Sequence, residues 1–198
     1  MGRIIRLLLL PILAGCSAAA SLVAIPGYFV DEVAYQFKGA ERSFPLDIEH
    51  TLAAVQRGLR EVRLDLDLIE RHAGNYALLF GNRELDGKLL LRADTPALST
   101  IYVQVHRGLK REDAIEQAIL DSIAKHAGDA SSHVRLAGFH PVYARPSRRA
   151  PTLGWFRPRA RLEVHRSQAS GWLIVSLPSG RKGYIRARIG RTKSGAKG

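Results

Sequence analysis

Two groups of residues could carry chemistry: a pair of carboxylates and a set of evenly spaced histidines. Asp65 and Asp67 alternate with leucines, which would place both carboxylates on one face of a strand, about 7 Å apart. Such a pair can share a proton or bind a cation, but the pattern favours a solvated polar face. His126, His133 and His140 are evenly spaced, but none of the seven histidines has the HxH or HExxH spacing of a metal site.

Nucleophilic chemistry has no candidate in this sequence. No serine lies in a G-x-S-x-G context, and no Gly-rich phosphate loop is present. The single cysteine, Cys16, excludes a disulfide within the chain and any zinc site built on several thiolates. We therefore predict a protein that is not an enzyme and that uses no cofactor or metal.

The charge of the chain is concentrated at its C-terminal end. The full sequence has 30 Lys and Arg, of which 23 are Arg, against 18 Asp and Glu, a net charge of +12. Residues 27–144 hold 14 basic and 17 acidic residues, whereas residues 145–198 hold 14 basic residues and a single acid, Glu163. A solvated, repulsive surface is one interpretation, and an anionic partner for the C-terminal segment is the other. For the second, we predict a ligand-binding surface formed by Trp155, Arg157, Arg159, Arg161 and Tyr184.

The N-terminus has the pattern of an export signal. Arg3 and Arg6 precede an apolar stretch over residues 7–13, which leads into Leu-Ala-Gly-Cys with Cys16 at its end. This sequence resembles the lipobox of bacterial lipoproteins. The resemblance implies cleavage before Cys16, a diacylglycerol on its sulfur and, because Ser17 rather than Asp follows, the outer membrane facing the periplasm.

Two alternatives to the lipobox remain open. The alanines at 18–20 could form an ordinary secretory cleavage site. Residues 7–30 also carry no charge and are long enough to span a bilayer as an uncleaved anchor. All three interpretations place the rest of the chain outside the cytoplasm, which favours peptidoglycan or another envelope polyanion, or a protein, as the partner and argues against nucleic acid.

The elements expected after the anchor alternate between two periods. Residues 28–37 alternate as a strand, Asp47 is a candidate N-cap, and residues 48–59 have helical spacing. Leucines and Val62 then recur at period two over residues 61–70. Further strands are expected at 76–80, 88–92 and 100–105, and a helix at 111–126 with Gly128 as its C-cap. Residues 16–20, 35–39, 44–47 and 101–105 resemble a family of small bacterial lipoproteins of uncharacterised function.

The C-terminal part has short apolar runs separated by Pro and Gly about every ten residues, the rhythm of a small all-β barrel. Its residues resemble the SH3-like domain of exported, wall-associated bacterial proteins: Arg145, Pro146, Gly171, Trp172, Val175, Gly180, Gly183, Tyr184 and Ile185. The resemblance implies a barrel over 139–190. A barrel of this size needs a large aromatic in its core, and we expect Trp172 there.

The predicted organisation divides the chain into six parts. These are a lipoprotein signal peptide at 1–15, an apolar anchor-proximal segment at 16–30, an α+β domain at 31–127, a linker at 128–138, the SH3-like domain at 139–190 and a basic tail at 191–198. The expected fold class is α+β, with two helices on one face of an antiparallel sheet, followed by a small all-β SH3-like barrel. The expected function is that of a cell-envelope lipoprotein that binds an anionic wall polymer or a protein. The alternative is an adaptor or targeting subunit for a cell-wall enzyme.

The lipobox interpretation predicts the outcome of replacing its cysteine. Cys16→Ser should leave a full-length precursor that incorporates no labelled fatty acid, because the thiol that accepts the lipid is gone. Metabolic labelling followed by electrophoresis measures this. Normal labelling of the Cys16→Ser protein would instead favour the ordinary signal peptide.

Overall fold

A computed structural model describes residues 39–129 and 134–186 of the chain. Cys16, the signal peptide at 1–15, the anchor-proximal segment, the strand expected at 28–37 and the tail at 191–198 lie outside the described residues. Within the described ranges, no helix is long and apolar enough to cross a membrane.

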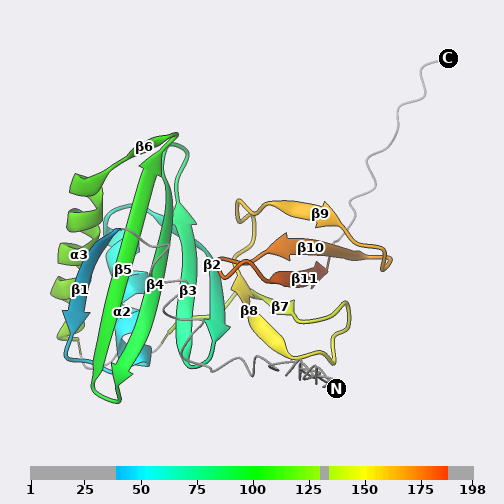
Figure 1. Ribbon diagram of the computed structural model, residues 1–198, viewed down its shortest axis with the longest axis horizontal. Coiled ribbons are helices and arrows are strands. Elements are labelled where there is room, and N and C mark those ends of the chain that lie inside the picture. Colours follow the sequence, from blue (N-terminus) through cyan, green and yellow to red (C-terminus); the bar gives the residue numbers. More distant parts are fainter. Residues whose placement is uncertain (1–38, 130–133, 187–198) are drawn as a thin grey trace, which may run out of the picture.

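The described strands form one antiparallel sheet (Figure 1). Ten of them follow the order β1-β5-β4-β3-β2-β8-β7-β11-β10-β9, and β6 pairs with β5 outside this path. The strands are β1 (Ala40–Phe44), β2 (Asp65–His72), β3 (Asn75–Gly81), β4 (Asp86–Thr95), β5 (Leu98–Arg107), β6 (Lys110–Arg111), β7 (His140–Tyr143), β8 (Thr152–Phe156), β9 (Val164–Arg166), β10 (Trp172–Ser176) and β11 (Lys182–Arg186). The helices are α2 (Ile48–Glu61) and α3 (Asp113–Ala127).

Helix α2 begins where the sequence predicts. The Asp47 carboxylate accepts a hydrogen bond from the backbone N–H of His50 at 2.9 Å, which makes Asp47 the N-cap. Its apolar stripe, including Leu52, Val55 and Leu59, is buried against the sheet. Gly58 lies at the crossing with α3, where a Cβ would come within 2.8 Å of Ile123. The glycine thus allows the two helices to pack closely.

Helix α3 is tied to the sheet by one buried carboxylate. Glu116 is fully buried and accepts hydrogen bonds from the backbone N–H groups of Ala40 on β1 and Val105 on β5, and from the Arg111 guanidinium. Burial raises the pKa of Glu116, but the hydrogen bonds from Arg111 and the two N–H groups outweigh it and leave this pKa below its ordinary value. Glu116 therefore acts as a charged structural link.

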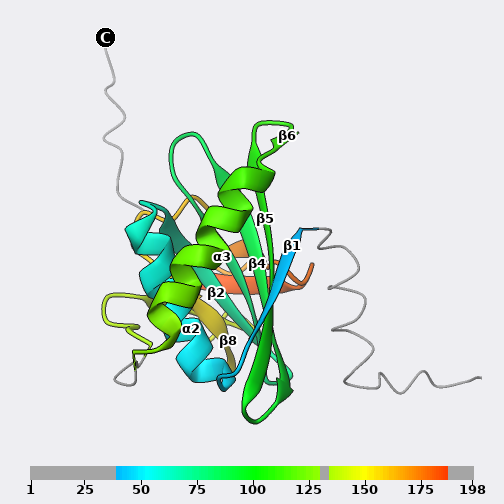
Figure 2. The same ribbon diagram turned by 90° about the vertical axis from the view of Figure 1, so that its left-hand side faces the viewer.

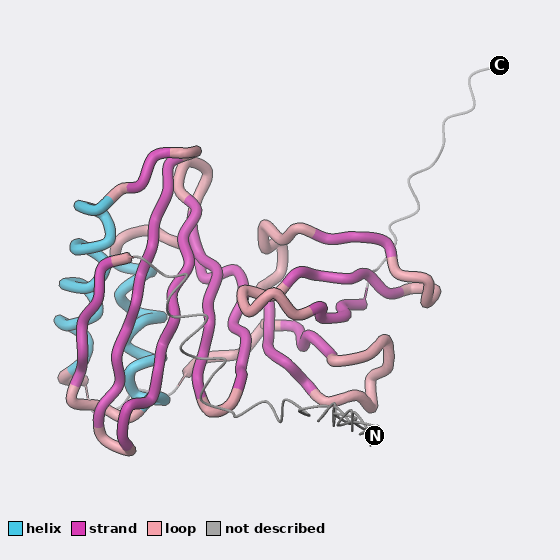
Figure 3. Tube along the Cα trace, in the orientation of Figure 1, coloured by secondary structure: helices cyan, strands magenta, loops and turns pink. Residues whose placement is uncertain are grey.

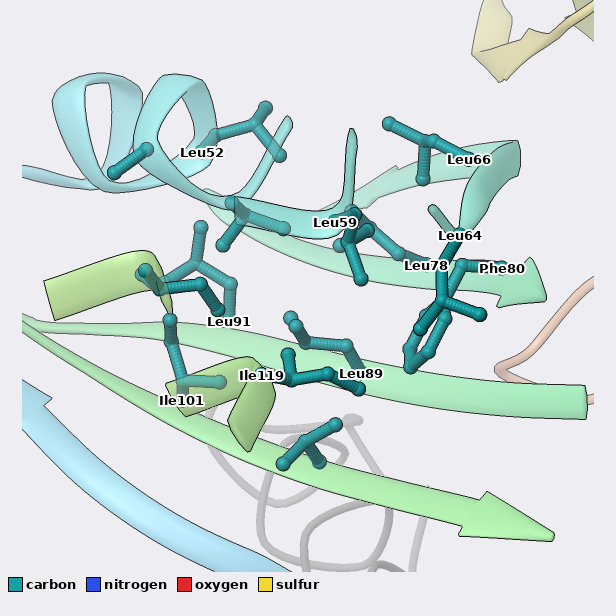
Figure 4. Close-up of a cluster of buried hydrophobic side chains, with 14 of the residues drawn as sticks. Leu52, Leu59, Leu64, Leu66, Leu78, Phe80, Leu89, Leu91, Ile101 and Ile119 are labelled. Atoms are coloured by element: carbon teal, nitrogen blue, oxygen red, sulfur yellow. The ribbon is translucent and has the colours of Figure 1, made fainter. Parts of the chain in front are cut away.

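The main core lies between the two helices and strands β1 to β5 (Figures 2 and 4). Leu78, Leu89 and Ile101 come from three neighbouring strands and are fully buried beneath Leu59 of α2 and Ile119 of α3. They lie on one face because alternate residues of paired strands point the same way. This core is complete without any residue of β9, β10 or β11.

The sheet does not end at β2, and this contradicts the expected fold class. β8 pairs with β2 in antiparallel register, with Leu68 opposite Phe156, Ile69 opposite Trp155 and Glu70 opposite Gly154. The expectation of an α+β domain followed by a separate SH3-like barrel is therefore wrong, because the same open sheet runs through both parts of the chain (Figure 3). The short strands at 139–190 were correctly expected. They join the sheet of the first half through β8, which pairs with β2.

A second core forms where the C-terminal strands turn over the face of β2 and β3 that the helices leave open. Val142, Val175, Leu177 and Ile185 are buried there against Leu68 of β2, and Leu79 of β3 packs beside them. The C-terminal strands thus use apolar side chains of the first half of the chain to complete their own core.

The β2–β8 ladder needs a residue without a side chain at position 154. A Cβ on Gly154 would lie 2.1 Å from the Ile69 carbonyl oxygen. We expect Gly154→Ala to lower the free energy of unfolding by about 1–3 kcal/mol, as overpacking does, because the two backbones must move apart. Urea unfolding measures this. Gly128→Ala is the matched control, since nothing lies within 4 Å of that position. If Gly154→Ala and Gly128→Ala had the same free energy of unfolding, the close approach of the β2 and β8 backbones at position 154 would be contradicted.

Candidate ligand-binding face

Two of the arginines predicted to bind a polyanion have partners inside the protein. Arg157 follows β8 and donates from Nε to Asp67 Oδ1 at 2.8 Å and from Nη2 to Asp65 Oδ2 at 3.0 Å. Arg161 lies 3.4 Å from Asp67 and 3.3 Å from Asp86. Their first role is therefore to join the C-terminal segment to β2 and β4. That they also bind a ligand stays a prediction.

A second ion pair across the same seam also has a buried carboxylate. The Glu70 carboxylate is fully buried and accepts from Arg181 Nη2 at 2.6 Å and from Arg181 Nε at 3.0 Å. The backbone N–H of Ser179 donates to the other oxygen at 2.9 Å. Because a carboxylate loses its water when buried, these donors replace that hydration. The turn before β11 is thereby fixed onto β2.

Asp67 is not on the solvated face that the sequence predicts. The register of β2 with β3 shifts between Leu66 and Leu68, so Asp67 has no residue opposite it in β3. This bulge sends Leu66 into the main core and Leu68 into the second core on the opposite face. Asp67 is 2% exposed as a result. A strict period-two pattern gives no signal of such a bulge.

Both tryptophans are only partly buried, and Trp172 differs from the core position that the sequence suggests. Trp155 is half-buried and packs against the main core, and its predicted ligand-binding role stays a prediction. Trp172, expected in a small core, belongs to neither core and is only partly buried. Its ring contacts Tyr143 edge-on, with centroids 5.7 Å apart. Trp172 therefore contributes to a surface.

That surface is the side of the C-terminal strands that faces away from the second core. Tyr143 lies opposite Tyr184, Tyr184 opposite Ile174, and Ile174 opposite His165, which places one row of side chains across four strands. Trp172 is two residues from Ile174 and shares its side. We call Tyr143, His165, Trp172, Ile174 and Tyr184 the outer face.

The outer face continues the side of the sheet that the helices cover in the first half. Ile69 of the main core lies opposite Trp155, Trp155 lies opposite Pro141, and Tyr143 follows two residues along β7. Over β7, β9, β10 and β11 no described helix covers this side (Figure 1). Its aromatic side chains are therefore partly exposed.

Two cations of β11 lie beside the outer face. Lys182 and Arg186 lie two residues before and after Tyr184 on β11, so all three side chains share one side of the sheet. Arg186 is directly opposite Trp172. Neither cation forms an ion pair with a residue in the described ranges. The acid of this segment, Glu163, lies 3.5 Å from His165. Partly exposed rings beside unpaired cations suit a ligand that has both an apolar surface and negative charge.

Arg159, the remaining predicted site residue, lies apart from the ion pairs. It is exposed, has a φ of +61° and pairs with no acidic residue of the described part of the chain. Its predicted role stays a prediction. The sequence analysis missed Tyr143 and Ile174 as residues of this face. Only the strand register shows that they adjoin Tyr184 and Trp172, so the sequence gives a weak signal for them.

The histidines provide no metal site in the described residues. His126 lies 2.7 Å from Glu61, and the His140 ring lies 5.5 Å from that of Phe156. No described group of three or more His, Cys, Asp or Glu residues has the geometry to hold a metal ion. His133 is outside the described residues.

Comparisons with known proteins give a distant similarity. No protein-family model matches this sequence. A stretch of 101 residues, 51% of the chain, is 27% identical to the protein pelota homologs of Saccharolobus islandicus strains L.S.2.15 and M.14.25. The matched stretch covers 29% of those proteins, so the chain spans less than a third of the length of the curated relatives it matches. Identity and coverage at this level do not assign the chain to their family.

The ion pairs predict that arginines of one short segment have different effects on stability. Arg157→Glu should lower the free energy of unfolding by about 3–5 kcal/mol, because it removes the nearer of the two arginines that neutralise the buried Asp67 and puts a like charge in its place. Arg159→Glu makes the same charge change on an exposed, unpaired residue and should stay within about 0.5 kcal/mol of the unmodified protein. Urea unfolding of both variants measures the difference. Equal losses would contradict the structural role of Arg157.

Proposed function

We propose that this protein is a non-enzymatic lipoprotein of the cell envelope that binds an anionic wall polymer through its outer face. The lipid on Cys16 holds it in a membrane, in the outer membrane facing the periplasm where the cell has two. The observation that supports binding most directly is the uncovered side of β7, β10 and β11, where Trp172 and Tyr184 adjoin Lys182 and Arg186.

The proposal follows from the chemistry of the two kinds of side chain. Sugar rings present apolar C–H groups that pack on aromatic rings, and Trp and Tyr also carry a polar group that stays in contact with water. Lysine and arginine bind the carboxylates of peptidoglycan through charge-assisted hydrogen bonds. An anionic polysaccharide with peptide carboxylates offers both features along its length, so a flat strand surface can contact several units at once.

The ion pairs across the seam change which cations are available for this function. Arg157, Arg161 and Arg181 are bound to Asp67 and Glu70 of β2. We therefore assign polymer binding to the cations that have no such partner, and to Lys182 and Arg186 first, because they share the side of the aromatic rings.

Sedimentation of the detergent-solubilised lipoprotein with purified sacculi tests the proposal. Binding should fall steeply between 0.1 and 1 M salt, because the screening length shrinks from about 10 Å to about 3 Å. Lys182→Glu with Arg186→Glu should weaken binding at least about tenfold at low salt, a change of about 1.4 kcal/mol. Trp172→Ala with Tyr184→Ala should weaken it by a similar factor at every salt concentration, since the lost contacts carry no charge to screen.

Matched controls place the same changes elsewhere on the surface. Arg83→Glu with Lys88→Glu reverses two exposed charges on the β3–β4 hairpin, and Leu109→Ala removes a fully exposed apolar side chain from the β5–β6 turn. Both controls should bind sacculi normally. Binding that is insensitive to salt and to all outer-face substitutions would exclude the anionic polymer as the partner.

A further inference from the structure

A pocket of about 310 Å³ lies where the two halves of the chain meet, away from the outer face. The end of α2 and the start of β2 form one side. The segment 134–139, which leads into β7, and the residue after β8 form the other. Its apolar lining includes Leu64, Leu66 and Phe139, and its charged lining consists of Arg60, Arg135, Arg157 and Asp65.

The charged lining has an excess of cations. Arg157 is engaged with Asp65 and Asp67. Arg60 and Arg135 form no ion pair with any residue in 39–129 or 134–186, and both are exposed. Outside those ranges the sequence contains only two acids, Asp31 and Glu32. Two guanidinium groups therefore share a pocket with one carboxylate that already binds a third.

The wall that carries Arg135 is held in place by hydrogen bonds. The Gln56 side chain donates to the Arg135 carbonyl at 3.1 Å and accepts from the Arg135 N–H at 2.9 Å. A turn follows at once, closed by the Phe139 N–H on the Leu136 carbonyl at 3.0 Å, with Gly138 at a φ of +85°. A wall fixed in this way needs little ordering when a ligand binds, which favours affinity.

We infer that this pocket binds the carboxylate of a small organic acid with a short apolar group, such as the C-terminal carboxylate of a peptide. The planar guanidinium groups of Arg60 and Arg135 match a carboxylate, and Leu64, Leu66 and Phe139 accept the apolar group. The volume is at the lower end for ligand sites, which limits the ligand to a few residues or fewer. Asp65 at the same pocket disfavours a doubly charged phosphate. This inference does not depend on the proposed function, because it uses no residue of the outer face.

Calorimetric titration of the full-length protein tests the inference with three probes: N-acetyl-alanine, its amide and inorganic phosphate. N-acetyl-alanine should bind at least tenfold more tightly than its amide, which lacks the charge, and at least tenfold more tightly than phosphate, which lacks the apolar group. Arg60→Gln with Arg135→Gln should weaken N-acetyl-alanine binding at least tenfold. Arg63→Gln with Arg83→Gln, two exposed arginines that do not line the pocket, should leave it unchanged.

Three results would overturn the inference. The amide could bind as tightly as the acid, phosphate could bind at least as tightly as the acid, or the Arg60 and Arg135 double variant could bind like the unmodified protein. Urea unfolding of the double variant should match the unmodified protein, because neither guanidinium forms an ion pair with a described residue and the Arg135 backbone bonds to Gln56 are kept. A loss of binding is therefore separable from a loss of fold. Sacculus binding of the double variant, which depends on the outer face, reports on the proposed function independently.

Discussion

Strand β2 depends on carboxylates that are buried away from water, and the rest of the molecule is arranged around their neutralisation. Asp67 and Glu70 are almost completely buried, and each accepts from an arginine of the C-terminal segment. Removing one member of such a pair leaves an uncompensated charge, which typically costs about 3–5 kcal/mol. The β2–β8 ladder and the second core hold the C-terminal segment against β2, and this places Arg157 and Arg181 beside the two carboxylates.

The uneven charge of the sequence is explained in part by this seam. The first half has an excess of acids and the C-terminal segment an excess of arginines. Arg157, Arg161 and Arg181 form pairs across the boundary, with Asp65, Asp67, Asp86 and Glu70 as their partners. Only the cations left over are available to an external anion. A charge asymmetry within one chain thus predicts contact between its parts before it predicts contact with a second molecule.

Local elements were predictable from the sequence, whereas their joining was not. Hydrophobic period and capping residues identified α2 with its N-cap Asp47, the strands that became β2 to β5, and α3. Each of these elements is recognisable from its own stretch of about 15 residues or fewer. The short strand β1 was missed, since its pairing partner β5 lies some 60 residues later. The ladder from β2 to β8 and the ion pair of Asp67 with Arg157 depend on contacts about 90 residues apart. The bulge at Asp67 breaks the strict alternation that the local sequence indicates.

The candidate site shows the same division. Tyr184 was named from its place in a turn-rich, basic segment, and the register places it at the centre of the outer face. Trp172 was expected in a core and lies instead on the outer face, because the spacing of a tryptophan does not say whether the side of the strand that it occupies is covered. Whether a side is covered depends on the helices, and Figure 1 shows them beside the strands of the first half, with none over β9, β10 or β11.

The bulge in β2 also matters during synthesis, when the chain is made from its N-terminus. Until residues 152–157 have been made, β2 is the last strand of its sheet, and its outer backbone groups have no partner. Free edges of this kind recruit strands from other molecules, and distant pairing is slow to form. A bulge bends the strand that carries it, and the bend together with the acidic side chains of β2 discourages such recruitment. The features that later receive the arginines of the C-terminal segment thus also protect the unfinished protein from aggregation.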